Sequence, residues 1–335
     1  MSKQIKRRQH IIPQFYLKSF AVQTKPNLYK IYCYFKQQKN KIKRLGVKNV
    51  AVKSFFYDDD KFPQPIETYL SFTEKDLSKT YHKIIKEKSI KNLSKKERSH
   101  IVYLTYIQYV RTEYMRTKII QIFKDLLEKE KSKYLVNHSI DEWNDFNEFG
   151  ITKHPIRLQK LLIVVNNEYL EYWRGKIDDS LLRIINIMLK VKNKILNKLF
   201  NSKQILLEIK SDNLEFYTCD HPILFYSKRS IQDDEGLTFL NIYDSYTQIY
   251  YPLSPKLCLN FYDSKIFYDY EKKFSNLKKE LYKSDINDIA LINKLATHEA
   301  YRMIFSKSGR FNIAQKYLDQ NSKFRELNQR RFYKI

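Results

Sequence analysis

The spacing of hydrophobic residues changes twice along this 335-residue chain, and this constrains the fold more than any other feature. From Leu28 to Phe35 apolar and polar residues nearly alternate, as they do in a half-buried strand. From Pro65 the apolar residues recur at helical spacing, and strand patterns return after Gln204 in QILLEIK, EFYTCDHPILFY, YTQIYYPLSP and KLCLNFYD. The pattern predicts an α+β protein. A mainly helical region at about 64–200 lies between a small N-terminal β-sheet and a C-terminal antiparallel β region with a late helix.

The chain contains no low-complexity linker and no repeat of fixed period, so we expect one intimately packed domain. Within it, residues 1–62 hold an N-terminal motif and a β-hairpin, 63–201 hold the helices, and 202–335 hold the later strands and a helix expected at about 284–305. The pattern leaves open whether the two strand regions form separate sheets or share one mixed sheet.

Two helix starts are marked by capping boxes, at Ser94 with Glu97 and at Ser139 with Glu142. The first box predicts a helix over about 95–131 whose apolar residues project in nearly every direction, which implies burial on most sides. Its polar residues form one narrow stripe, made of Thr105, Gln108, Arg111 and Thr112. An unpaired buried arginine is very unfavourable, so this stripe requires partners.

Glu67 and Glu74 are the obvious partners of this stripe. They lie two helical turns apart on the preceding predicted helix, so both carboxylates face the same way. A buried ion-pair network that fixes two helices and a functional site with Arg111 are both compatible with this spacing.

The formal charge of +25 predicts a polyanionic partner, above all DNA or RNA. The candidates for nucleic-acid binding are the clustered basic residues Lys6, Arg7, Arg8, Lys41, Lys43 and Arg44. The codon bias of an AT-rich genome also enriches lysine, so a solvated basic surface without a nucleic-acid partner is the alternative. No apolar run approaches the ~18 residues of a membrane-spanning helix, and the three cysteines lack metal or disulfide spacing. We therefore expect a cytoplasmic protein without a membrane partner.

Residues Arg7 to Ala21, RRQHIIPQFYLKSFA, combine a basic cluster, a histidine, a proline and an aromatic run. This segment resembles the His-x-x-Pro-Gln-Phe-x-Leu-x-x-Phe motif that opens the bacterial family DUF4238, a domain of unknown function. Later blocks of the chain are also similar to the family, namely VKNVAVKSFFY, the Glu67, Glu74 and Arg111 set, YTCDHP and PLSP. The resemblance implies an accessory-genome protein in defence against phage, with an operon-encoded partner protein as one expectation, but it implies no settled reaction.

The residues in these blocks include the groups that a hydrolytic site needs, which are a titratable base, carboxylates and a cation. Our candidates for catalysis are His10, Gln14, Arg111, Asp220 and His221, with Glu67 and Glu74 as structural residues or as ligands of Mg or Mn. Walker-type, GxGxxG, HExxH and GxSxG motifs are all missing. We predict a nuclease-like or other phosphodiester-directed effector in which His10 is the base and Asp220 orients it or binds metal. The alternatives are a non-catalytic nucleic-acid-binding or sensor module and a structural interaction protein.

Overall fold

The computed structural model describes residues 5–58, 64–119, 155–176, 179–227, 246–263, 278–282 and 285–326. The capping box expected at Ser139 and Glu142 lies outside these residues, as does the part of the expected 95–131 helix after Ile119. Among the described residues, no helix combines the length and the apolar character needed to cross a bilayer.

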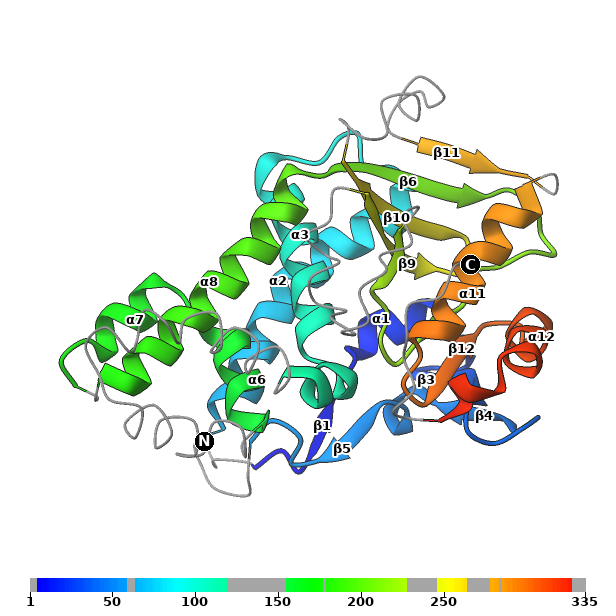
Figure 1. The fold of residues 1–335 in the computed structure, drawn as a ribbon. Coiled ribbons are helices and arrows are strands. Elements are labelled where there is room, and N and C mark those ends of the chain that lie inside the picture. Colours follow the sequence, from blue (N-terminus) through cyan, green and yellow to red (C-terminus); the bar gives the residue numbers. More distant parts are fainter. Residues whose placement is uncertain are drawn as a thin grey trace.

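The α+β prediction is confirmed, with a mainly helical centre between early and late strands. Figure 1 shows most helices gathered on one side of the sheets, with α11 on the other. The helices are α1 (Gln14–Ser19), α2 (Pro65–Glu87), α3 (Lys95–Val110), α6 (Pro155–Val164), α7 (Asn167–Trp173), α8 (Asp179–Asn201), α11 (Ile286–Glu299) and α12 (Asn312–Gln320). The strands are β1 (Arg8–His10), β2 (Val22–Lys25), β3 (Leu28–Phe35), β4 (Ile42–Gly46), β5 (Val52–Ser54), β6 (Lys203–Ile209), β7 (Thr218–Cys219), β8 (Leu224–Ser227), β9 (Thr247–Ser254), β10 (Leu257–Tyr262), β11 (Lys278–Leu281) and β12 (Met303–Ser306).

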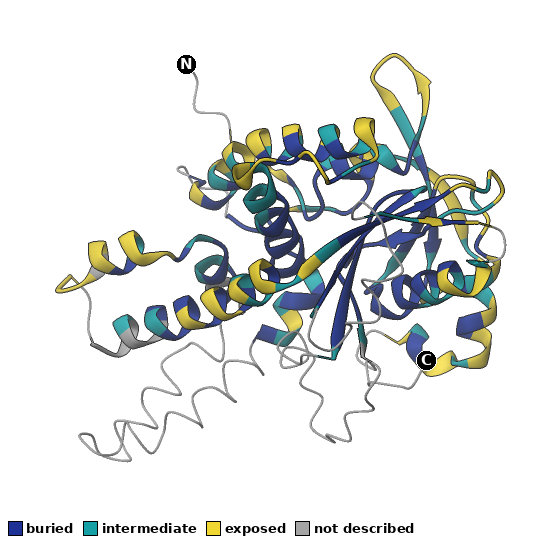
Figure 2. Ribbon diagram, turned by 90° about the horizontal axis from the view of Figure 1, so that it is seen from above, coloured by how far each residue is buried: buried dark blue, intermediate teal, exposed yellow. Residues whose placement is uncertain are grey.

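The C-terminal strands form a sheet in the order β11-β6-β10-β9-β8, which is antiparallel except for the parallel pair β11 and β6. Successive side chains of a strand point to opposite faces. Leu206 and Leu259 accordingly join the hydrophobic cluster of α2, α3 and α8, whereas Leu207 and Cys258 join the cluster of α11. Both faces are therefore covered, and Figure 2 shows the central strands buried, with exposed residues on the outer turns of the helices and along a protruding hairpin.

A second sheet joins the two ends of the chain. Its order is β2-β3-β12-β7, with β4 also paired to β3. Strand β12 pairs with the early strand β3 on one side and with β7 on the other, both antiparallel. The late helix is therefore shorter than the sequence indicated, because α11 ends at Glu299 and the chain turns at Ala300 into a strand. The reason is a long-range contact, since the Asp220 carboxylate accepts hydrogen bonds from three backbone amides at this turn.

The long interior helix is also interrupted. Helix α3 begins at the Ser94 capping box as predicted but ends at Val110, and a separate helix covers 113–119. The amide of Gln159 on α6 donates to the carbonyls of Val110 (2.9 Å) and Thr112 (2.8 Å), which replaces helical hydrogen bonds at the break. Thr112 then caps the next helix by accepting a hydrogen bond from the Met115 amide (3.3 Å). The break places Arg111 at the end of α3.

Tyr16 on α1 connects the N-terminal motif to the late strands and provides a test of this packing. Its buried hydroxyl donates to the Pro252 carbonyl (2.7 Å) and forms a hydrogen bond with the Thr218 hydroxyl (2.6 Å). The Tyr16→Phe variant leaves a buried carbonyl without this donor, so we expect the free energy of unfolding to fall by about 1–3 kcal/mol in urea titrations. Tyr29→Phe is the control, because its exposed bond to Gln23 should contribute little. Equal, small losses for both variants would contradict this assignment.

Candidate functional site

A pocket of about 210 Å³ lies where the N-terminal motif meets α2 and the end of α3. Its titratable and amide side chains are those of Lys6, His10, Gln14, Glu67, Glu74 and Arg111. The structure therefore brings together most of the residues that the sequence marked as catalytic or as carboxylate candidates. They come from four segments, β1 with the residues before it, α1, α2 and the end of α3.

Arg111 is the centre of this arrangement and is 2% exposed. Its Nη1 donates to Glu74 Oε1 (2.5 Å), its Nη2 to the main-chain carbonyl of His10 (2.7 Å), and its Nε to the Tyr57 hydroxyl (3.1 Å). Tyr57 in turn donates to the Arg111 carbonyl at 3.2 Å. One guanidinium thus joins α2, β1 and the segment that follows β5, as the planar donor set of arginine allows.

Two further residues, which the sequence reasoning missed, set the position of α2. Gln9 is fully buried, and its Oε1 accepts hydrogen bonds from the backbone amides of Tyr57 (2.6 Å) and Asp58 (3.3 Å). The Asp58 carboxylate accepts from the amides of Ile66 (3.4 Å) and Glu67 (2.7 Å), at the start of α2. Asp58 lies seven residues before Pro65, outside the N-cap position that Gln64 occupies, so the usual capping signals do not mark it in the sequence. Nothing local marked Gln9, whose partners are 48 and 49 residues away.

His10 lines the pocket at the end of β1, and its Nε2 is buried without a hydrogen-bond partner among the described residues. Burial and the nearby Arg111 guanidinium lower its pKa from 6.5 to about 4, because both disfavour the imidazolium form. The imidazole is therefore neutral at pH 7, and a neutral ring nitrogen can accept a proton.

Glu67 faces the same pocket with a perturbed carboxyl group. Burial raises its pKa, and Glu74 acts in the same direction, while Lys6 (3.4 Å) and Arg111 lower it. A raised pKa increases the protonated fraction, which is what a general acid requires. Glu67 and Glu74 are also the residues that could offer oxygen ligands to Mg or Mn. Within the described ranges, no three His, Cys, Asp or Glu side chains converge as metal ligands.

Asp220 and His221 lie elsewhere. Asp220 lines a different pocket, and its two carboxylate oxygens accept hydrogen bonds from the backbone amides of Tyr301 (2.7 Å), Arg302 (2.7 Å) and Met303 (3.2 Å). His221 is fully buried, with its Nδ1 at 2.7 Å from the Thr112 hydroxyl. The structure therefore does not bring Asp220 or His221 to the His10 pocket.

The basic residues that the sequence marked as candidates for nucleic-acid binding form two groups. Lys6 lies at the pocket, and next to it Arg7 and Arg8 are exposed, with Arg8 donating to the Lys48 carbonyl and to Asn49. The second group is on the hairpin of β3 and β4, where Lys43 and Arg44 are exposed and Lys41 is half-buried. Lys41 and Arg44 lie over the rings of Phe35 and Tyr32, at 5.4 and 5.2 Å from the ring centroids. The pairing of cations with aromatic rings makes this hairpin a candidate nucleic-acid surface.

Comparison with known families gives a match over residues 8–310 to the model of a family described as "Protein of unknown function (DUF4238)". Neither the curated proteins nor the solved structures contain a significant match to the chain.

The low pKa of His10 predicts a specific pH dependence of stability. In the unfolded chain the imidazole takes up its proton near pH 6.5, but in the folded protein only near pH 4, so His10 makes the native state less stable as the pH falls through this range. We expect the loss in free energy of unfolding between pH 7 and pH 5 to be smaller in His10→Gln than in the parent protein. Denaturant titrations at the two pH values measure this difference. A His10 NMR titration midpoint near 6.5 would contradict the buried, neutral state.

Proposed function

The chain belongs to the DUF4238 family, whose function is unknown, and we propose that it is a phosphodiester-directed hydrolase of the nuclease type. The observation that carries the proposal is the convergence of His10, Glu67 and Arg111 on one pocket from segments far apart in the sequence. A neutral imidazole, a carboxyl group with a raised pKa and a buried cation are the groups that this hydrolysis uses.

In this proposal His10 takes a proton from a water molecule held by Gln14, and the water oxygen forms a bond to phosphorus. The bond between phosphorus and the leaving oxygen breaks, and protonated Glu67 gives its proton to that oxygen. Lys6 and Arg111 stabilise the negative charge that develops on the phosphoryl oxygens. If Mg or Mn is bound, Glu67 and Glu74 would hold it as ionised carboxylates, and the ion would supply the charge stabilisation at the leaving oxygen in place of the proton of Glu67.

The charge of the molecule supports a nucleic-acid substrate. The formal net charge is +25, and exposed cations occur both beside the pocket and on the β3–β4 hairpin. An effector in defence against phage is the setting that the family resemblance implies, and we keep it as part of the proposal.

The second candidate is a nucleic-acid-binding or sensor module without catalysis. The ion pair of Arg111 and Glu74 favours this second candidate, because the hydrogen bonds of Arg111 connect β1, α2 and the residues after β5 and therefore have a structural role. In that case the hairpin cations bind phosphates and the pocket is a structural network. The third candidate is a structural interaction protein whose positive charge arises from codon usage.

Cleavage assays separate these candidates. We expect the parent protein to cut labelled DNA or RNA, and His10→Ala and Glu67→Gln to reduce the rate by about 10²–10⁴-fold, the usual contribution of a general base or acid. The assay is run with and without Mg or Mn, and Lys25→Gln, which removes an exposed charge that does not line the pocket, is the control.

If the protein binds nucleic acid more weakly as the salt concentration rises but cleaves none, the hydrolase proposal is wrong and the binding module is favoured. In that outcome the Lys41→Gln, Lys43→Gln and Arg44→Gln triple variant should reduce the salt dependence of binding, while His10→Ala should not. Absence of binding at low salt would leave the structural interaction protein.

A further inference from the structure

A second pocket of about 320 Å³ lies at the junction of the two ends of the chain. Early residues such as Phe35 and Lys53 form part of its lining, and Asp220, Arg302 and Met303 form another part. Pockets of this size accept small organic ligands, for which about 300–1,000 Å³ is typical. None of the residues that line it also lines the His10 pocket.

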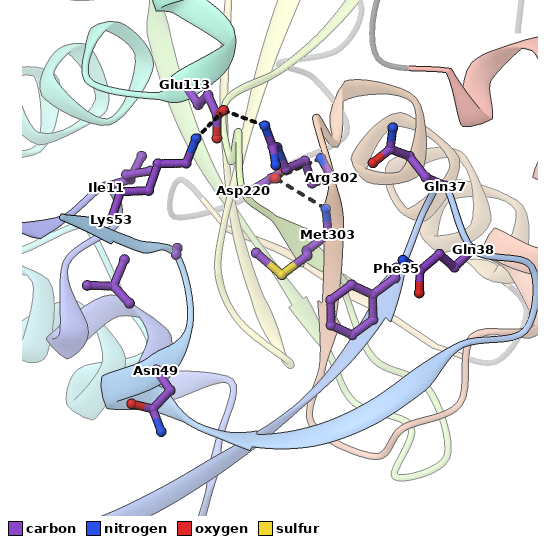
Figure 3. Close-up of a pocket in the computed structure, with 12 residues that line it drawn as sticks. Ile11, Phe35, Gln37, Gln38, Asn49, Lys53, Glu113, Asp220, Arg302 and Met303 are labelled. Carbon is purple, nitrogen blue, oxygen red and sulfur yellow. Dashed lines mark hydrogen bonds and ion pairs between the residues drawn. The ribbon is translucent and has the colours of Figure 1, made fainter. Parts of the chain in front are cut away.

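On one wall of this pocket two cations share one carboxylate. Lys53 and Arg302 reach Glu113 from opposite sides and both contact its Oε1, with Arg302 Nη2 at 2.8 Å (Figure 3). A single carboxylate cannot neutralise two cations. Their side chains are 39% and 43% exposed, whereas that of Glu113 is 17% exposed, so a ligand can reach the cations. A guanidinium has five N–H donors, so Arg302 can bind Glu113 and an anion at the same time.

Asp220 is the second carboxylate of the lining and keeps its negative charge, so the described lining holds two cations and two anions. Its carboxylate accepts hydrogen bonds from the backbone amides of Tyr301, Arg302 and Met303, which fixes the turn from which the Arg302 side chain extends. Lys36 holds the same turn by donating to the carbonyls of His298 (2.9 Å) and Ala300 (2.8 Å). Arg302 is thus presented by a rigid backbone, which favours specific binding.

The rest of the pocket is suited to a flat, partly polar body. Figure 3 shows Phe35 and Met303 on the side away from Lys53, and both are half-buried. Amide side chains of Gln37, Gln38 and Asn49 belong to the same lining. Lys41, which lies over one face of the Phe35 ring, does not line the pocket, so a nucleobase would stack on the other face. The amides supply the donor and acceptor pairs that a base edge requires.

We propose that this pocket binds a nucleoside monophosphate, with its phosphate on Lys53 and Arg302 and its base against Phe35 within reach of the amides. The phosphate bridges the two cations from the open side of the pocket. Glu113 keeps the cations in place when the ligand is absent, and it competes with the phosphate when the ligand is present. This proposal is independent of the phosphodiester chemistry in the other pocket.

Isothermal titration calorimetry of the full chain with the four common ribonucleoside monophosphates, the matching nucleosides and inorganic phosphate tests this site. We expect at least one monophosphate to bind ten-fold or more tightly than its nucleoside and than inorganic phosphate. Arg302→Gln and Lys53→Gln should each weaken this binding by about ten-fold or more, the effect of losing one charged hydrogen bond. Glu113→Gln should strengthen it, because the competing charge is removed.

Two further variants complete the test. Phe35→Leu should reduce the advantage of the nucleotide over inorganic phosphate, and Lys25→Gln should change nothing. The melting temperature of each variant shows that it is folded. Nucleotides that bind no better than inorganic phosphate, or affinities that do not respond to Lys53, Arg302 and Glu113, would overturn the proposal. A monophosphate contains no phosphodiester bond, so this result is separate from the presence or absence of nuclease activity.

Discussion

The buried guanidinium of Arg111 is the interaction on which the geometry of the first pocket depends. A charge at this depth is stable only with partners, and it has a carboxylate on α2, a main-chain carbonyl in β1 and the Tyr57 hydroxyl. These partners fix the distance between the N-terminal motif and α2. The same charge lowers the pKa of His10, so one residue both assembles the pocket and helps to set the protonation of its base.

The two pockets are neighbours because they share two short segments. His10 lines the first pocket and Ile11 the second, while Arg111 lines the first and Glu113 the second. The break between α3 and the following helix lies between Arg111 and Glu113. Gln159 stabilises this break by donating hydrogen bonds to the carbonyls of Val110 and Thr112. In a continuous helix, the side chains of Arg111 and Glu113 would have a different orientation relative to each other. The interruption therefore has a direct consequence for both sites.

Local patterns predicted the elements of this fold well, and long-range contacts account for most of the differences. The starts of α2 and α3 and the full extent of β3 follow from proline, capping and alternation signals within a few residues. The break at Arg111 depends on a glutamine 48 residues along the chain, and β12 depends on Asp220, so neither leaves a local signal. The residues around the His10 pocket show the same difference between local signals and long-range contacts. Glu74 was predicted as a partner of Arg111 from helical spacing, whereas Gln9 acts through backbone amides that no sequence pattern identifies.

The central claim is that Arg111 and Glu74 stabilise the fold as one unit, and a double-mutant cycle of equilibrium unfolding tests it most directly. The single variants are Arg111→Met, which leaves the half-buried Glu74 carboxylate without its cation, and Glu74→Gln, which leaves the buried Arg111 guanidinium without its countercharge. We expect the double variant to be less destabilised than the sum of the two single variants, with a coupling free energy above about 1 kcal/mol. Effects that add to within about 0.5 kcal/mol would show that the two residues act independently, and would contradict it.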